Sequence, residues 1–140
     1  MKKRKAQTIS LDERVFILSK TYASIPLYFA HWEDAKIKPE QLDSVYHTFL
    51  NRAIKTEDRK DFFLLMWEFF GLLNNGHSWY RDDELNGNPL PLGFSCLEMA
   101  GQRVVTWSSI QTLKKGDVVV SINDKSIDDY YTDFSKYISA

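Results

Sequence analysis

In the first half of the chain, apolar residues recur at intervals of three and four, the spacing of one face of an α-helix. Ser10 and Glu13 have the spacing of a capping box, so a helix is expected to begin directly after Ser10. Pro26 lacks a backbone N–H, and a kink or break is therefore expected near Ser24. The apolar face of this first helix comprises Leu11, Val15, Leu18, Tyr22, Ile25 and Phe29.

Two further apolar faces follow. The second helix should begin near Pro39, because proline suits the first helical turn. The third should begin after Thr56, a residue type suited to the N-cap, and end where Asn75 or Gly76 adopts the left-handed conformation. The two faces comprise Leu42, Val45, Tyr46, Phe49, Leu50 and Ala53, and then Phe62, Leu65, Met66, Phe69, Phe70 and Leu73. Three such faces bury by packing together, which predicts a three-helix bundle.

The pattern changes near residue 84, after which short apolar segments alternate with turn residues. Strands are expected at residues 90–97, 103–107 and 118–122, of which the last has the clearest signal. A final helix should begin after Ser126, with Asp129 at the capping-box position. The order of elements predicts an α+β protein in which the helical bundle precedes a small β module with a C-terminal helix.

The predicted organisation has three parts. Residues 1–9 read as a disordered basic tail, residues 10–80 as a helical domain and residues 85–140 as the β module. Most of the aromatic residues lie in the first 80 positions, which fits aromatic packing between helices.

Composition excludes several classes of function. The chain has 140 residues and a formal net charge of −1, which argues against a strongly basic nucleic-acid-binding protein. Its single cysteine, Cys96, excludes an intramolecular disulfide and a cysteine-rich zinc site. No apolar run is long enough to span a bilayer, and no metal or cofactor motif is present, so neither a metal nor a cofactor is expected.

His77 is the best single candidate for chemistry. It follows Gly76, which places it on a turn, and a histidine can serve as a general base near neutral pH. The alternative is an ordinary loop histidine. His31 and His47 have no partner at metal-ligand spacing and are interpreted as structural or surface residues. Cys96 could pair with His77 as a thiolate, but its position in a strand favours a buried thiol.

A second candidate site lies at Leu92, Gly93 and Phe94. A glycine between apolar residues at the start of a strand can expose backbone N–H groups, which could capture the terminal carboxylate of a peptide. The edge of the following strand could then pair with the peptide backbone.

Two motifs together carry a family resemblance. Leu72–Ser78, with the sequence LLNNGHS, resembles the L-x-D-G-H-[TS] signature of the C-terminal-processing (tail-specific) serine peptidases and their tricorn-core relatives. Leu113–Lys125, with the sequence LKKGDVVVSINDK, resembles the L-K-x-G-D-V-I-L-S-I-N-G-K run of PDZ-like modules. Asn75 stands where the first signature usually has aspartate, and Asp124 where the second usually has glycine.

The resemblance covers roughly residues 10–140 and implies that residues 85–140 form a PDZ-like module, reduced between Trp107 and Leu113. In this family the nucleophilic serine lies in a later αβ domain, which would begin where this sequence stops. The resemblance thus implies the front part of a longer peptidase, inactive on its own. His77 would be the general base in tricorn-like members, whereas a lysine of the catalytic domain serves in others.

The implied function is to position peptide substrate for that serine domain. The implied partners are peptide or protein C-termini, bound at Leu92, Gly93 and Phe94, and the catalytic domain itself. Nucleic acid and a membrane span are not expected. The chain shows no export signal, although the family habit would place it in the periplasm or cell envelope. The alternatives are a stand-alone PDZ-like module that binds peptide C-termini, or a helical interaction scaffold.

Overall fold

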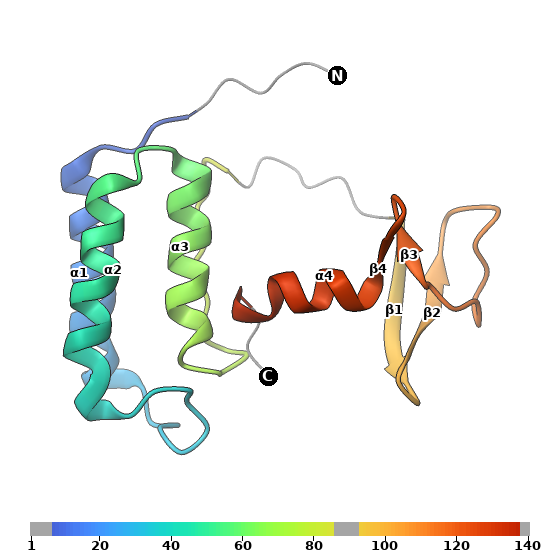
Figure 1. The fold of residues 1–140 in the computed structure, drawn as a ribbon, viewed down its shortest axis with the longest axis horizontal. Coiled ribbons are helices and arrows are strands. Elements are labelled where there is room, and N and C mark those ends of the chain that lie inside the picture. The colour runs from blue at the N-terminus through green and yellow to red at the C-terminus, as the bar shows by residue number, and fades with distance from the viewer. Residues whose placement is uncertain (1–6, 86–92, 138–140) are drawn as a thin grey trace. The chain divides into compact units, whose positions relative to one another are not determined.

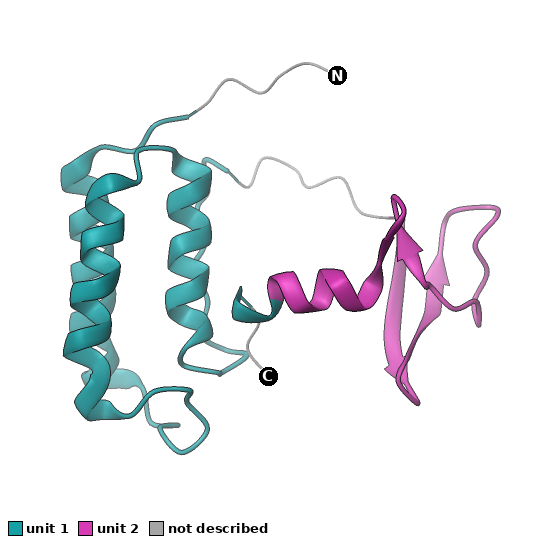
Figure 2. Cartoon of the chain, in the orientation of Figure 1, with its two compact units in different colours: residues 1–86, 135–140 teal, residues 87–134 magenta. Residues whose placement is uncertain are grey.

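Residues 7–85 and 93–137 are described by the computed structural model (Figure 1). In these two stretches the chain forms four α-helices and two small antiparallel sheets, so the predicted α+β class is confirmed. The chain divides into two compact units (Figure 2). Unit 1 is Met1–Asn86 with Ser135–Ala140, and unit 2 is Gly87–Phe134.

Helix α1 (Leu11–Tyr28) begins as predicted. The Ser10 side chain accepts a hydrogen bond from the backbone N–H of Glu13 at 3.3 Å. Of the kink or break expected near Ser24, the break is wrong, because α1 continues through Pro26 to Tyr28. The side chain of Ile25, next to that proline, is buried in the core, and its packing favours the continuous helix.

The next helical elements are η1 (Pro39–Gln41), α2 (Leu42–Lys55) and α3 (Arg59–Gly71). Pro39 opens this region, as expected. The N-cap of α3 is Asp58 rather than Thr56: its carboxylate accepts the backbone N–H groups of Lys60 at 2.9 Å and Asp61 at 3.1 Å. Thr56 instead follows the last turn of α2, where its hydroxyl donates to the Arg52 carbonyl at 2.8 Å.

The helices of unit 1 share one hydrophobic core. Consecutive helices pack against each other, and the rings of Phe49 and Phe69 meet edge to face with centroids 5.1 Å apart. Ile9 also belongs to this core, and Thr8 pairs with Asp58, so the packed part of unit 1 includes residues that the sequence placed in the tail. The core comprises Ile9, Leu18, Ile25, Ile37, Leu42, Phe49, Ala53, Phe62, Leu65, Met66, Phe69 and Leu73.

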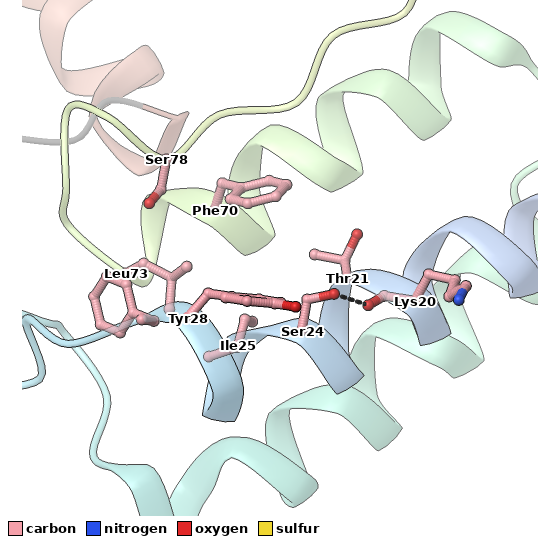
Figure 3. Close-up of a pocket in the computed structure, with 9 residues that line it drawn as sticks. Lys20, Thr21, Ser24, Ile25, Tyr28, Phe70, Leu73 and Ser78 are labelled. Atoms are coloured by element: carbon pink, nitrogen blue, oxygen red, sulfur yellow. Dashed lines mark hydrogen bonds between the residues drawn. The ribbon is translucent and has the colours of Figure 1, made fainter.

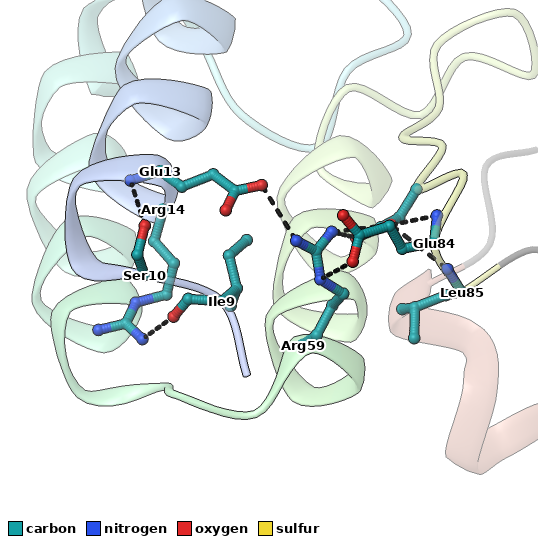
Figure 4. Close-up of polar contacts among 8 residues, drawn as sticks. Ile9, Ser10, Glu13, Arg14, Arg59, Glu84 and Leu85 are labelled. Atoms are coloured by element: carbon teal, nitrogen blue, oxygen red, sulfur yellow. Dashed lines mark hydrogen bonds and ion pairs between the residues drawn. The ribbon is translucent and has the colours of Figure 1, made fainter. Parts of the chain in front are cut away.

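A buried charge cluster fixes the segment that leaves unit 1 (Figure 4). Arg59 is 7% exposed and Asp82 is 4% exposed. Nη1 of Arg59 donates to both carboxylate oxygens of Asp82 at 3.1 and 3.0 Å, and Nη2 donates to Glu13 at 3.1 Å. Asp82 also accepts the backbone N–H of Glu84 at 3.0 Å. The cluster therefore joins α1, α3 and the segment that follows the turn after α3.

Unit 2 contains β1 (Phe94–Met99), β2 (Gln102–Ser108), β3 (Ser121–Ile122), β4 (Lys125–Ser126) and α4 (Ile127–Phe134). β1 pairs antiparallel with β2, and β3 with β4. Helix α4 begins as predicted, because the Ser126 hydroxyl accepts the backbone N–H of Asp129 at 3.0 Å. The strand expected at residues 118–122 is wrong in extent. Only its last two residues form β3, and Val118 makes an isolated bridge to Val104 of β2.

The described chain returns to unit 1 in η2 (Ser135–Tyr137), which packs on α3. A side-chain carbon added at Gly71 would lie 2.3 Å from the backbone oxygen of Lys136, so this approach requires glycine. The ammonium of Lys136 pairs with Glu68 at 3.5 Å. The sequence did not predict this contact between the two ends of unit 1.

Candidate functional site

The turn after α3 carries His77. Helix α3 ends at Gly71, and the residue in the left-handed conformation is Asn74, with φ of 47°, rather than Asn75 or Gly76. Asparagine tolerates this conformation better than most residues. The side-chain amide of Asn74 also donates to the backbone oxygen of Asp34 at 3.0 Å, which ties the turn to the loop after α1.

Asn75 shapes the corner on which His77 lies. Its side-chain oxygen accepts the backbone N–H of His77, and its backbone oxygen accepts that of Ser78, each at 2.9 Å. This double turn holds the backbone of His77 while its side chain is exposed. Within residues 7–85 and 93–137, the imidazole has no hydrogen-bond partner. The geometry therefore presents an exposed imidazole on a hydrogen-bonded turn.

Three surface hollows adjoin this turn. One, of about 450 Å³, is lined by Gly76, His77 and their neighbours. A second, of about 230 Å³, is lined by Gly76 and Ser78 together with aromatic residues that include Trp67 and Trp79. The third, of about 370 Å³, lies between α1, α3 and the turn and includes Ser78 (Figure 3). The third is called the α1/α3 hollow below.

The α1/α3 hollow was missed in the sequence. Its lining comes from the second half of α1 and from the segment around the end of α3. The sequence carries no distinct signal for it, because Lys20, Thr21 and Ser24 lie outside the apolar face of the helix, as polar residues of an amphipathic helix do.

The described residues provide no partner that would make His77 a complete catalytic centre. No hydrogen bond joins its imidazole to a hydroxyl or thiol in the described stretches. Cys96 is half-buried on β1 in unit 2, whereas His77 belongs to unit 1. Exposed His31 lies beside Phe29, and exposed His47 lies on α2. Among the described residues, no three histidine, cysteine or acidic side chains are grouped as metal ligands.

The second candidate site is only partly described, because Leu92 lies outside the described residues. Gly93 has φ of 79°, and its carbonyl accepts the backbone N–H of Ser109 at 2.7 Å and its hydroxyl at 3.0 Å. Phe94 is half-buried and begins β1 opposite Ser108. In the described part of unit 2, β2 is the only strand paired with β1, which leaves the other edge of β1 open.

No protein-family model, curated protein or solved structure matches this chain. Among the described residues, no helix combines the length and apolar character that crossing a membrane requires.

Proposed function

We propose that this chain is the non-catalytic N-terminal part of a serine endopeptidase of the C-terminal-processing family. In this proposal unit 1 is the helical domain, unit 2 is the PDZ-like module, and the chain positions peptide substrate for a serine-nucleophile domain. The observation that carries the proposal is the exposed imidazole of His77 on a turn fixed by two hydrogen bonds to Asn75.

The turn geometry suits a general base that acts on a group supplied from elsewhere. Hydrolysis by a serine needs the nucleophile, its base and oxyanion donors within hydrogen-bond reach of one another. His77 meets the requirement for an accessible base, but it has no nucleophile bonded to it in the described residues. Its backbone is already held, so the rotation of the imidazole is what would remain to be ordered when a serine hydroxyl approaches.

The proposed peptide-binding role uses β1 and the turn at Gly93. A peptide could extend the sheet at the open edge of β1, with its terminal carboxylate near Gly93 and Phe94. The same edge supports the second candidate function, a stand-alone module that binds peptide C-termini. The two functions differ in their need for His77.

The first experiment measures peptidase and binding activity of the purified chain. The chain should not cleave fluorescently labelled casein, and calorimetry should show tighter binding of a peptide with a free C-terminus than of its C-terminal amide. Cleavage that a single serine substitution within the chain abolishes would overturn the non-catalytic assignment. Equal binding of the two peptides, or none, would remove carboxylate capture.

A matched pair of glycine substitutions locates the carboxylate site. Gly93 and Gly101 both have positive φ, of 79° and 76°, so alanine strains the backbone at each. Only at Gly93 would the added carbon also meet a side chain, the Ser109 hydroxyl at 3.2 Å, so the unfolding free energy of both variants is measured alongside binding. They lie before β1 and between β1 and β2, respectively. Gly93→Ala should weaken binding of the free-carboxylate peptide, whereas Gly101→Ala should not. Equal effects of both variants would place the carboxylate elsewhere.

His77→Ala separates the two candidate functions. Because the side chain is exposed and unpaired in the described stretches, the free energy of unfolding should change by less than about 0.5 kcal/mol. When the chain is assayed with the serine domain it is proposed to serve, His77→Ala should abolish cleavage and leave peptide binding unchanged. The control is His47→Ala, at an exposed position on α2. Full cleavage by the His77→Ala protein would discard the catalytic role.

A further inference from the structure

The α1/α3 hollow has the size and lining of a small-molecule site (Figure 3). Its volume of about 370 Å³ falls in the range usual for ligand pockets. Ile25 and Leu73 contribute buried apolar side chains, and the half-buried rings of Phe29 and Phe70 widen the apolar surface. An apolar group placed here would lose water-exposed area without displacing a charged side chain.

Of the described residues that line the hollow, the only charged one is positive. Lys20 lies at one end of the hollow, and Leu73 and Ser78 lie at the other (Figure 3). No acidic residue lines the hollow, and in the described part of the chain no carboxylate lies within ion-pair distance of the Lys20 ammonium. An exposed lysine beside an apolar surface favours a ligand whose apolar body ends in one negative charge.

We propose that the α1/α3 hollow binds a medium-chain fatty acid. The alkyl chain would lie over Ile25 and Phe70, and the carboxylate would pair with Lys20. From Lys20 to Tyr28, α1 extends about 12 Å at 1.5 Å per residue, which is long enough for an extended chain such as that of octanoate. This site is independent of the peptidase proposal, because it uses neither His77 nor any residue of unit 2.

Two of the four hydroxyl groups in the lining, both on the α1 wall, already donate to backbone carbonyls. Along that wall an alkyl chain is favoured over a peptide end, which would offer the same combination of apolar group and carboxylate. The Thr21 hydroxyl donates to the Ile17 carbonyl at 2.9 Å, and the Ser24 hydroxyl donates to the Lys20 carbonyl at 2.8 Å. These two hydroxyl protons are therefore unavailable to the carbonyl groups of a peptide backbone. An alkyl chain needs no such donor.

The test is a titration of the full chain, labelled with ¹⁵N, with octanoate below its micelle concentration. Octanoate should shift the amide signals of residues 20–29 and 70–78. Octan-1-ol and octylamine have the same alkyl chain without the negative charge, and octan-1-ol should bind about two- to fivefold more weakly, the range expected for one exposed ion pair. Octylamine should bind still more weakly, because its ammonium repels Lys20.

Three variants sharpen the test. Lys20→Gln should weaken octanoate binding about two- to fivefold and leave octan-1-ol binding unchanged. The matched control is Lys60→Gln, at another exposed helical lysine that lines none of the hollows described above. Ser24→Trp places a large ring at the exposed rim of the hollow and should abolish binding of both ligands while the helical circular dichroism is retained.

Three results would overturn the proposal. Octanoate shifts that spare residues 20–29 and 70–78 would remove the site. Equal affinities for octanoate and octan-1-ol, unaffected by Lys20→Gln, would remove the carboxylate. Tighter binding here of a tripeptide with an apolar C-terminal residue would assign the hollow to peptide ends. Loss of octanoate binding in Ser24→Trp with unchanged peptide binding at β1 would support two separate sites.

Discussion

Removal of the Asp82 carboxylate should destabilise unit 1 far more than removal of its neighbour, Asp83. Asp82 is 4% exposed and accepts two hydrogen bonds from the guanidinium of Arg59. It also accepts the backbone N–H of Glu84, so its side chain holds the turn that follows Arg81. Asp82→Ala removes all of these contacts and leaves the buried charge of Arg59 with fewer partners.

The expected loss can be worked from those contacts. Removing one partner of a buried ion pair costs about 3–5 kcal/mol, because the remaining charge is left without compensation. Arg59 would keep Glu13 at 3.1 Å and Glu84 at 3.4 Å, so the lower end of that range applies. We therefore expect Asp82→Ala to lower the free energy of unfolding by about 3 kcal/mol. At about 4 °C per kcal/mol, the melting temperature should fall by about 12 °C.

Urea unfolding followed by far-UV circular dichroism measures this loss, because most of the helical signal comes from α1, α2 and α3. The control is Asp83→Ala. Asp83 pairs with Arg81 at 2.6 Å, but the two side chains are 80% and 63% exposed, so the control should lose less than about 1 kcal/mol. If the two variants lost equal amounts of unfolding free energy, burial would not be the reason that the Arg59–Asp82 pair stabilises the protein.

The remaining predictions concern one turn and two titrating groups. Asn74→Ala should cost about 1–2 kcal/mol because φ is 47°, and Asn74→Gly should cost less; equal losses would assign the effect to the lost side-chain hydrogen bond. The hydrogen bonds from Arg52 lower the pKa of Glu68, so its stabilising effect is present above about pH 4.5 and is lost as the pH falls through the lowered pKa. The stability difference between the wild type and Glu68→Gln should therefore shrink in acid, and a constant difference would contradict this. Burial raises the pKa of Tyr80 to about 12, so its contribution is complete below pH 10.0 and is lost as the pH rises towards 12. Tyr80→Phe should remove that alkaline loss, and ultraviolet titration of the wild type should show a late tyrosine ionisation that is missing from the Tyr80→Phe variant.

Local signals predicted the elements better than they predicted the pairings. Ser10 and Ser126 were found as N-caps because a hydroxyl and the backbone it caps lie within three residues. Thr56 and Asp58 are both residue types suited to the N-cap of α3. Asp58 takes that position, while the Thr56 hydroxyl donates to a backbone carbonyl of α2. The strand signal at residues 118–122 was read from β-branched residues, which favour extended backbone but do not determine the partner strand.

The candidate site shows the same division. The turn with His77 could be predicted, because Asn75, Gly76 and their neighbours are turn formers. Which residue of the turn adopts the left-handed conformation could not be predicted. It is Asn74, whose side chain bonds to the backbone oxygen of Asp34, forty residues earlier in the chain. The α1/α3 hollow was beyond sequence reasoning because its two walls are far apart in the chain and meet only through packing.

The contact of η2 with α3 has a consequence for the order in which the protein is made. The helices of unit 1 emerge from the ribosome first and can begin to pack there, since domains tend to fold as they are synthesised. The surface of α3 around Gly71 must then wait for Lys136, which is made only after the whole of unit 2. During that interval unit 2 is tethered at one end. Docking of η2 makes unit 2 an insertion whose two ends both join unit 1, and closing such a loop costs conformational entropy that grows only slowly with its length.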